Sequence, residues 1–551
     1  MKPVVSFLLC AFALLPSNSS FAQTTAARSA DELRGQVTPE REWWDLMHYD
    51  LAVEVFPESK TIAGTNQIKF KVLAESSRMQ IDLQPPLKIE SVSHEQQTLK
   101  FEREGNVYWI DFPQPLPVGS TNVIHIKYGG TPIEATNPPW EGGITWKKDE
   151  HGNHFIATTC QNLGASAWWP CKDHGIDEPD NGMRIRATVP EDLKAVSNGR
   201  LLEETHSAEN KTRTFQWEVK NPINNYAVSL NIGNYVHFAD KFDGEAGPLD
   251  IDYWVLRGQA ERAKAHFKEA PRTLKAFEHW FGKYPFYEDS YKLVVVPYLG
   301  MEHQSAVSYG NLFGNGYKGR DLSETGVGLK FDFIIVHESG HEWFGNSLTS
   351  QDIADMWIHE SFTNYAETLF VDYHFTTEEG NDYVIGCRKL IKNDDPIIGK
   401  YNLHKTGSKT DMYYKGGNML HMIRQIVNDD KKFRTILRGL NKTYFHQTIT
   451  TQQVEDYLSK QTGVDLSSLF DQYLRNTQIP KLTLSFEGKK ITYQFEDCVE
   501  DLCFPVKLNV DGKELWIKPK AAQQSVTAEA EVKELSVDRN FYLRSSVNEE
   551  E

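Results

Sequence analysis

Residues 337–346 read His-Glu-Ser-Gly-His-Glu-Trp-Phe-Gly-Asn and directly follow an apolar run. Apolar positions at helical spacing predict a helix over residues 325–346. Histidines four positions apart on a helix project from one face, so His337 and His341 can bind one metal ion. Glu338 is turned about a quarter of the way around the helix, where it can address a water at that metal. The stretch predicts a metal-dependent hydrolase.

A second acidic segment offers the third ligand. A catalytic zinc ion takes three protein ligands and keeps one position open for water. Glu360 follows His341 by 19 residues, in a segment over residues 356–374 whose apolar positions predict a helix. Glu367 shares the face of Glu360 and is a candidate to hold a histidine ligand by a hydrogen bond, with a surface carboxylate as the alternative. Asp355 is a weaker candidate for the same role.

The sequence before this segment has the alternation of half-buried strands. Leu51, Val53 and Val55 alternate with less apolar residues, and similar short runs continue to about residue 235. Turns with Pro, Gly and Asn separate the runs. The pattern predicts an N-terminal β-sheet domain over residues 45–237, preceded by an extension over residues 23–44.

Helical spacing then dominates until about residue 477, and strands return after it. We expect a mostly helical catalytic domain over residues 238–478, with its clearest other helices at 416–427 and 466–475. Two hairpin signals, Glu487-Gly488 and Asp511-Gly512, predict a small β-sandwich-like domain over residues 479–546. An acidic tail fills residues 547–551. The predicted fold class is therefore a multidomain α+β protein.

The N-terminus has the pattern of a secretory signal. Lys2 precedes an apolar run over residues 4–16, and small residues surround Phe21. Such a run is too short for a membrane helix and typical of a signal peptide, here residues 1–22. We expect an exported protein, periplasmic or secreted, whose mature chain has no membrane span.

Charge and cysteine spacing exclude other classes. The chain has 551 residues, with 59 Lys and Arg against 76 Asp and Glu, so its net charge of −17 would repel nucleic acid. No Cys-x-x-Cys pair supports a thiolate zinc site. Cys498 and Cys503 lie in one short acidic loop, and their spacing allows a local disulfide and two free thiols equally.

The arrangement His-Glu-x-x-His, 18 residues, then Glu, in the settings HEWFGN (341–346) and WIHESFTNYAE (357–367), resembles the M1 family of zinc aminopeptidases. This gluzincin group also contains leukotriene A4 hydrolase. The succession of a β domain, a catalytic domain and a small β domain is similar to that family as well. The resemblance implies a thermolysin-like catalytic domain, one Zn²⁺ per chain on His337, His341 and Glu360, and a short form without the large helical C-terminal domain of longer members.

The resemblance extends to the substrate-binding segments. Gly300-Met301-Glu302-His303 corresponds to the family's Gly-x-Met-Glu-Asn motif, which implies that Glu302 binds the free α-amine of a peptide and that Gly300 and Met301 contact the substrate. An ammonium group in a partly dry cleft requires a carboxylate. This chain departs from the motif, because His303 replaces Asn and no Gly lies two positions before Met301.

Two further residues are implied in the same way. Tyr413-Tyr414-Lys415-Gly416 matches the family's Tyr-x-Lys-Gly motif, so Tyr413 would donate a hydrogen bond to the oxyanion. Cys160-Gln161-Asn162 resembles the stretch that sends a Gln or Glu into the cleft, which makes Gln161 a substrate-binding candidate. The alternative for Gln161 is an amide bonded within the β domain.

These residues together predict removal of N-terminal residues from peptides with a free N-terminus. Glu338 would act as the general base and Tyr413 as the oxyanion donor. A zinc endopeptidase or an epoxide hydrolase on the same scaffold is the first alternative, and a non-catalytic exported binding protein is a less favoured one. His303 and His359 match no ligand spacing and are interpreted as pocket walls or packed rings. The preferred N-terminal side chain and the oligomeric state do not follow from the sequence.

Overall fold

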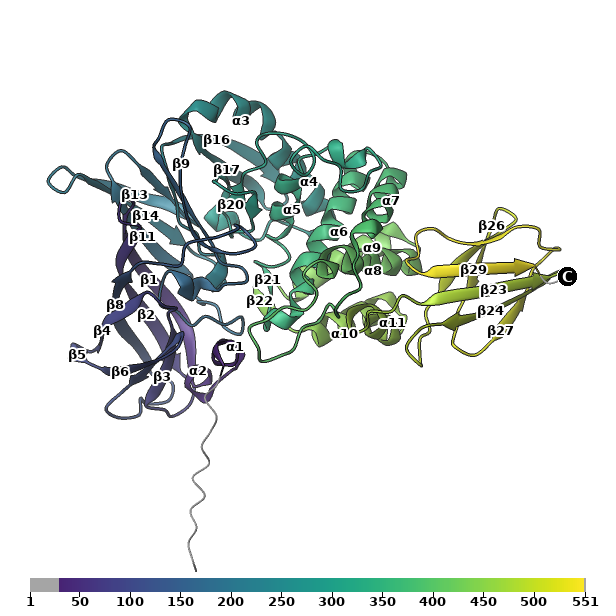
Figure 1. The fold of residues 1–551 in the computed structure, drawn as a ribbon, viewed down its shortest axis with the longest axis horizontal. Helices are drawn as coiled ribbons and strands as arrows, with labels where there is room; N and C mark the ends of the chain where they lie inside the picture. The colour runs from purple at the N-terminus through teal and green to yellow at the C-terminus, as the bar shows by residue number, and fades with distance from the viewer. Residues whose placement is uncertain (1–28, 550–551) are drawn as a thin grey trace, which may run out of the picture.

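A computed structural model describes residues 29–549, which form three parts in sequence order (Figure 1). Sheets make up the N-terminal part, helices and a mixed sheet make up the middle part, and two small sheets form the C-terminal part. The purple N-terminal sheets and the yellow C-terminal strands lie at opposite ends of the molecule, with the helices between them. The predicted α+β fold class is confirmed. The predicted signal peptide (1–22), the start of the extension and the last tail residues lie outside the described residues.

The N-terminal part is organised around the hairpin of β1 and β2. Leu51, Val53 and Val55 of β1 are buried, while the residues between them are partly exposed, as expected for a strand with one face on a core. β1 also pairs in parallel with β11. The described sheets here have the strand orders β13-β14-β11-β1-β2-β8-β4-β5, β3-β7-β6 and β12-β15-β10-β9. The bounds are α1 (Ala30–Gly35), α2 (Pro39–Glu42), β1 (Trp44–Phe56), β2 (Thr61–Val72), β3 (Arg78–Asp82), β4 (Lys88–His94), β5 (Gln97–Thr98), β6 (Lys100–Glu104), β7 (Val107–Asp111), β8 (Thr121–Gly130), β9 (Gly143–Lys148), β10 (His154–Thr159), η1 (Ala165–Ala167), β11 (Met183–Pro190), β12 (Lys194–Val196), β13 (Arg200–Ser207), β14 (Thr212–Val219), η2 (Asn225–Ala227) and β15 (Asn231–Gly233).

A mixed sheet of order β16-β17-β18-β20-β19 opens the middle part. Residue 237, where we expected the β domain to end, lies inside β16, which pairs with β17 over its whole length. β19 is the edge strand of this sheet, and it carries Gly300 and Met301. The bounds are β16 (Tyr235–Gly244), β17 (Gly247–Leu256), β18 (Tyr291–Val295), β19 (Gly300–Met301) and β20 (Val307–Tyr309).

Helices form the rest of the middle part and pack around α6. Every residue of α6 from Trp357 to Val371 is buried, because α4, α5, α7 and α8 all contact this helix. The bounds are η3 (Arg257–Gln259), α3 (Ala260–His266), α4 (Glu269–Phe281), η4 (Tyr287–Asp289), η5 (Val327–Leu329), α5 (Phe333–Gly340), β21 (Leu348–Ser350), η6 (Ile353–Asp355), α6 (Trp357–His374), α7 (Thr377–Gly386), η7 (Cys387–Leu390), α8 (Asp411–Val427), α9 (Asp430–Thr443), β22 (Gln447–Ile449), α10 (Thr451–Thr462) and α11 (Ser467–Leu474).

The helix expected over residues 325–346 is shorter in the structure. It begins only after Asp332, whose carboxylate accepts hydrogen bonds from the backbone N–H groups of Ile334 and Ile335 and so caps α5. It ends at Gly340, and the chain then turns and reaches a positive φ of 128° at Gly345. His341 follows the last helical residue but keeps helical dihedral angles, so it stays on the face of His337.

Two small sheets of order β27-β24-β23-β29 and β26-β25-β28 form the C-terminal part. Both predicted hairpins are present, β23 with β24 and β25 with β26. Cys498 and Cys503 precede β25 and are free thiols in the structure. The bounds are β23 (Lys481–Glu487), β24 (Lys490–Glu496), β25 (Val506–Val510), β26 (Lys513–Ile517), β27 (Gln524–Thr527), β28 (Leu535–Val537) and β29 (Arg544–Glu549).

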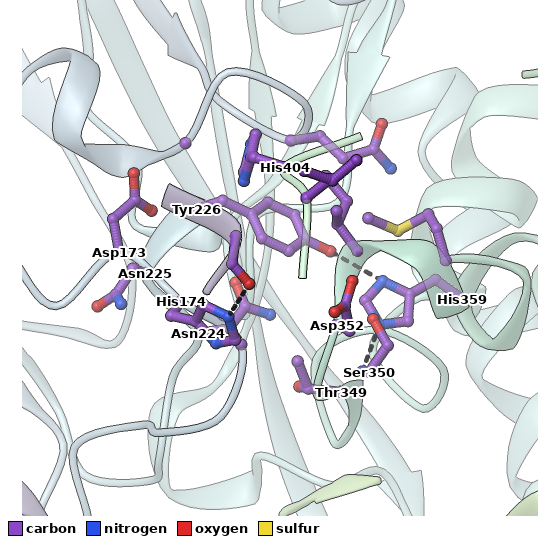
Figure 2. A pocket seen from close by; sticks show the side chains of 17 residues that line it. Asp173, His174, Asn224, Asn225, Tyr226, Thr349, Ser350, Asp352, His359 and His404 are labelled. Carbon is purple, nitrogen blue, oxygen red and sulfur yellow. Dashed lines mark hydrogen bonds between the residues drawn. The ribbon is translucent and has the colours of Figure 1, made fainter. Parts of the chain in front are cut away.

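The N-terminal and middle parts enclose a small cavity of about 70 Å³ (Figure 2). α1 closes one side of this contact: Arg34 donates to Nε2 of His404 at 2.9 Å, and the backbone oxygen of Asp31 accepts a hydrogen bond from the N–H of His404. The two parts therefore share polar contacts. Between residues 29 and 549, no helix combines the length and apolar character needed to cross a membrane.

Candidate active site

One cavity of about 260 Å³ lies where α5, α6, α8, β19 and the turn after β10 meet. Residues far apart in the sequence meet here, because the N-terminal part supplies one wall and the middle part supplies the others. All nine predicted site residues line it: Gln161, Gly300, Met301, Glu302, His337, Glu338, His341, Glu360 and Tyr413.

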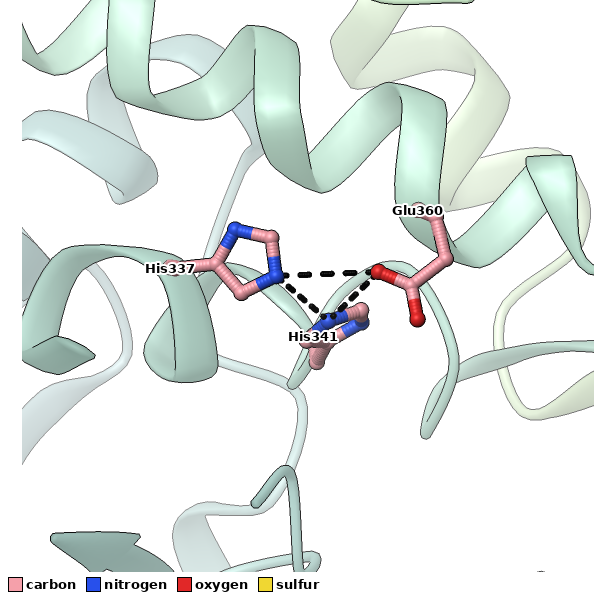
Figure 3. A group of neighbouring side chains, drawn as sticks. All are labelled: His337, His341 and Glu360. Carbon is pink, nitrogen blue, oxygen red and sulfur yellow. Dashed lines mark hydrogen bonds and ion pairs between the residues drawn. The ribbon is translucent and has the colours of Figure 1, made fainter. Parts of the chain in front are cut away.

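The three predicted metal ligands point at a common centre (Figure 3). The Nε2 atoms of His337 and His341 are 3.3 Å apart, and Oε2 of Glu360 lies 3.6 Å and 3.3 Å from them. Ligand atoms about 2.0–2.1 Å from a tetrahedral zinc ion are separated by about 3.4 Å. The three atoms thus have the spacing that one zinc ion requires.

Hydrogen bonds outside this centre fix the orientation of both imidazole rings. His341 donates from Nδ1 to the backbone oxygen of Phe344 at 2.9 Å, and Nδ1 of His337 lies 2.7 Å from Oε1 of Glu367. With both Nδ1 protons engaged, each Nε2 turns a lone pair toward Glu360. Oε2 of Glu360 is buried without a hydrogen-bond partner among the described residues. Three facing lone pairs repel one another unless a cation lies between them, so the residues fit a metal ion.

Glu367 is a buried support and not a surface carboxylate. Besides His337, it accepts hydrogen bonds from the hydroxyl of Tyr383 at 2.6 Å and from the amide of Asn364 at 3.2 Å. The prediction for Asp355 is wrong. Its carboxylate accepts hydrogen bonds from Thr451 at the start of α10 and from Tyr401, because η6 turns it away from the histidines.

Glu338 lies beside the metal ligands, under the edge strand. Gly300 allows this close approach: a Cβ at that position would lie 2.8 Å from Oε1 of Glu338 and 2.8 Å from a methyl group of Ile334. Burial raises the pKa of Glu338 to about 8. A carboxylate that binds a proton near neutral pH can accept one from water and release it again.

One side chain, Gln161, links the carboxylate of Glu302 to the predicted metal ligand Glu360. Nε2 of Gln161 donates to Oε1 of Glu302 at 2.7 Å and to Oε1 of Glu360 at 2.6 Å. Both acceptors lie in the middle part, so the alternative for Gln161, an amide bonded within the β domain, is not what the structure has. Asn346 also donates to the backbone oxygen of Glu302 at 2.9 Å. Glu302 is 3 % exposed, so its charge is available only to a group inside the cavity.

Tyr413 and Tyr414 differ in what they face. The ring of Tyr413 stacks on His337 with centroids 5.9 Å apart, and burial together with the charges of Glu360 and Glu302 raises its pKa, so the phenol keeps its proton. Burial, followed by the charges of Glu367 and Cys387, raises the pKa of Tyr414, whose ring lies against Tyr413 and stacks on none of the three predicted metal ligands. Tyr413 is therefore the phenol that can donate toward the metal ligands.

Three other side chains complete the surroundings. His303 is fully buried with Nδ1 2.9 Å from the Ser308 hydroxyl, which agrees with a packed ring. His359 is buried and accepts a hydrogen bond from the N–H of Ser350. The sequence did not predict Tyr226, whose hydroxyl lies 3.2 Å from His359. It belongs to no motif, and only the contact between the two parts of the molecule reveals it.

Known families and structures resemble this chain along most of its length. Residues 46–227 match the profile of the peptidase M1 N-terminal domain, and residues 265–473 match that of the peptidase family M1 domain. A leucyl aminopeptidase of Saccharolobus solfataricus is 22% identical over 443 residues, covering 74% of this chain and 54% of its own. Aminopeptidase N of Lactococcus lactis subsp. lactis is 21% identical, covering 79% and 51%. The chain spans about half the length of the curated relatives it matches.

A solved structure has a similar fold. The M1 zinc metallopeptidase of Deinococcus radiodurans, crystallised as a mutant bound to a Tyr-Ser-Ala substrate, superposes with a TM-score of 0.66 at 21% identity. The match covers 79% of this chain and 95% of that one. At this identity the likeness concerns the fold.

Proposed function

The chain belongs to peptidase family M1, and on that premise we propose that it is a zinc-dependent aminopeptidase that removes N-terminal residues from peptides. One observation carries the proposal: Gln161 hydrogen-bonds both to Glu302 and to Glu360. A carboxylate suited to an ammonium group is thereby held at a short, fixed distance from the metal ligands. Only the peptide bond next to a free α-amine can reach the metal when that amine lies on Glu302.

The metal would be one zinc ion per chain, held by His337, His341 and Glu360. When bound, zinc polarises the scissile carbonyl and acidifies a water molecule. The solved relative in Deinococcus is a zinc metallopeptidase, which supports this choice of metal. Glu367 and the backbone oxygen of Phe344 hold the two imidazoles in orientation for it.

Glu338 and Tyr413 perform the proton transfer and the charge stabilisation. Glu338 takes a proton from the attacking water and returns it to the leaving amine, a role that its raised pKa suits. Tyr413 keeps its proton and donates a hydrogen bond from the phenolic hydroxyl to the substrate oxygen on which negative charge develops. Met301 and Gly300 form the edge strand along which the substrate backbone lies.

The site gives no support to the alternatives. An endopeptidase has no need of a carboxylate for a free amine, and here the buried Glu302 carboxylate, bonded to Gln161, lines the same cavity as the metal ligands. A binding protein without catalysis has no need of Glu338 and Tyr413 beside the metal ligands. The substrates are therefore peptides with a free N-terminus. We also infer, from the pattern of residues 1–22 alone, that the protein is exported to the periplasm or secreted.

A matched pair of substrates tests the proposal. The zinc-loaded protein is assayed with aminoacyl p-nitroanilides of Ala, Leu, Phe and Arg and with their N-acetylated counterparts. Cleavage of at least one unblocked compound, at least a hundredfold faster than its acetylated form, is the expected result. Equal cleavage of both forms would identify an endopeptidase, and cleavage of neither despite bound zinc would contradict an aminopeptidase.

A further inference from the structure

Trp140 presents a half-exposed indole at the active-site cavity. The side chain is 50% exposed, and it lines the cavity of about 260 Å³ together with its neighbour Pro139. The indole has no hydrogen-bond or ring-stacking partner among residues 29–549. Tryptophan side chains are highly buried on average. An indole left open at a cavity that binds a substrate therefore has apolar surface available to that substrate.

The hairpin of β9 and β10 delivers Trp140 and Gln161 to the same cavity. Gly143, the first residue of β9, pairs with Thr159, the last residue of β10. Trp140 therefore precedes one strand and Gln161 follows the other at the same end of the hairpin. Gly142 allows the chain to come this close, since a Cβ there would lie 2.3 Å from the backbone oxygen of Thr159. One hydrogen-bonded unit thus positions both side chains.

Hydrogen bonds at its base hold the turn that carries Trp140. The backbone N–H of Glu141 donates to the backbone oxygen of Asn137 at 2.9 Å. The hydroxyl of Thr136 donates to the Glu141 carboxylate at 2.6 Å. The backbone of the turn is therefore ordered before a substrate arrives, which lowers the entropy cost of packing a ligand against the indole.

The depth of the cavity indicates which part of a substrate Trp140 meets. Glu302 and the metal ligands are buried, whereas Trp140 and Lys409 line the cavity from its exposed rim. A peptide whose amine lies on Glu302 enters with its N-terminus first, so its N-terminal residue occupies the buried end. The scissile bond then lies at the metal ligands, and the residue after that bond leads outward. Its side chain is the first that can reach the rim.

We propose that Trp140 is a specificity-determining residue that packs against the side chain after the scissile bond, and that it favours peptides whose second residue is aromatic or aliphatic. The proposal rests on the proposed function and names a substrate class for it. Packing a large apolar side chain against the indole removes apolar surface of both groups from water, whereas a glycine at that position covers almost none. Pro139 extends the apolar surface at the rim.

Three substrates with the same N-terminal leucine test the proposal: Leu-Phe-amide, Leu-Gly-amide and leucinamide. The first two differ only in the second side chain, and leucinamide, which has no second residue, corrects for any general loss of activity. In the wild type, kcat/KM should be about tenfold higher for Leu-Phe-amide than for Leu-Gly-amide, the effect of burying one aromatic side chain. Trp140→Ala should bring this ratio close to one.

Two further variants separate the role of the indole from an effect on folding. Trp140→Phe keeps an aromatic ring at the rim and should retain most of the preference. Phe56→Ala is the matched control, because Phe56 is also a half-exposed aromatic residue, 41% exposed at the end of β1, and does not line the cavity. Its ratio should equal that of the wild type.

A ratio in Trp140→Ala within twofold of the wild type, or an equal loss of kcat/KM for all three substrates, would overturn the proposal. Should the wild type cleave none of the three, the proposed function fails, and calorimetric titration of the zinc-loaded proteins with the two dipeptide amides still decides the role of Trp140. Tighter binding of Leu-Phe-amide that is lost in Trp140→Ala supports the proposal. Equal affinities in the wild type, or no binding of either compound, would contradict it.

Discussion

The metal-binding end and the amine-binding end of the cavity are built in opposite ways. His337, His341 and Glu360 come from α5, the residue after it, and α6, two helices that pack against each other. Glu302 follows a two-residue edge strand, and its carboxylate is held by Gln161 from the N-terminal part. The first end is local in sequence and supported by helix packing. The second depends on how two parts of the chain meet, so the two ends should respond differently to substitution.

The largest effect is expected at Glu338, which lies between the two ends. Glu338→Ala should reduce kcat by about a thousandfold, because a general base contributes about 10²–10⁴-fold, while the bound zinc is unchanged. Single-turnover kinetics and metal analysis of the purified variant measure both quantities. Turnover within a few-fold of the wild type would show that another group accepts the proton.

Glu367→Ala tests the support of the metal end. Loss of the hydrogen bond to Nδ1 of His337 should weaken zinc affinity by about 10–100-fold and leave the KM of the zinc-saturated enzyme nearly unchanged. Competition with a chelator gives the affinity, and initial rates in excess zinc give the KM. Glu261→Ala on α3, where the side chain is 89% exposed, is the control. If KM rises as much as the zinc dissociation constant, Glu367 affects substrate binding as well as zinc binding, which would contradict the separation of the metal-binding end from the amine-binding end.

Asp355→Asn should produce the smallest change at the site. Its carboxylate holds Thr451 at the start of α10, so we expect the free energy of unfolding to fall by about 1–2 kcal/mol with no change in zinc affinity. Chemical denaturation of the zinc-free protein measures the first quantity, and the chelator competition measures the second. Weakened zinc binding in this variant would show that Asp355 does support the metal ligands.

The same contrast explains what the sequence could predict. The ligand set followed from spacing alone, since four positions on a helix and a second helix with Glu360 leave little freedom. The helix around His337 was predicted too long, because the cap at Asp332 and the turn before Gly345 depend on the local backbone. Gln161 was found through a family resemblance. Tyr226 was not found, because its contacts join η2 to α6 across the interface between the two parts, and no local pattern encodes them.

Glu302→Gln tests the central claim most directly, because it removes the charge that should bind the substrate amine and keeps the shape of the side chain. The measurement is kcat/KM for an unblocked aminoacyl p-nitroanilide, with zinc content determined on the same sample. We expect kcat/KM to fall at least about a hundredfold at full zinc occupancy, the effect of losing an ionic hydrogen bond to a buried charge. A kcat/KM within threefold of the wild type would contradict the assignment of Glu302 as the amine-binding carboxylate.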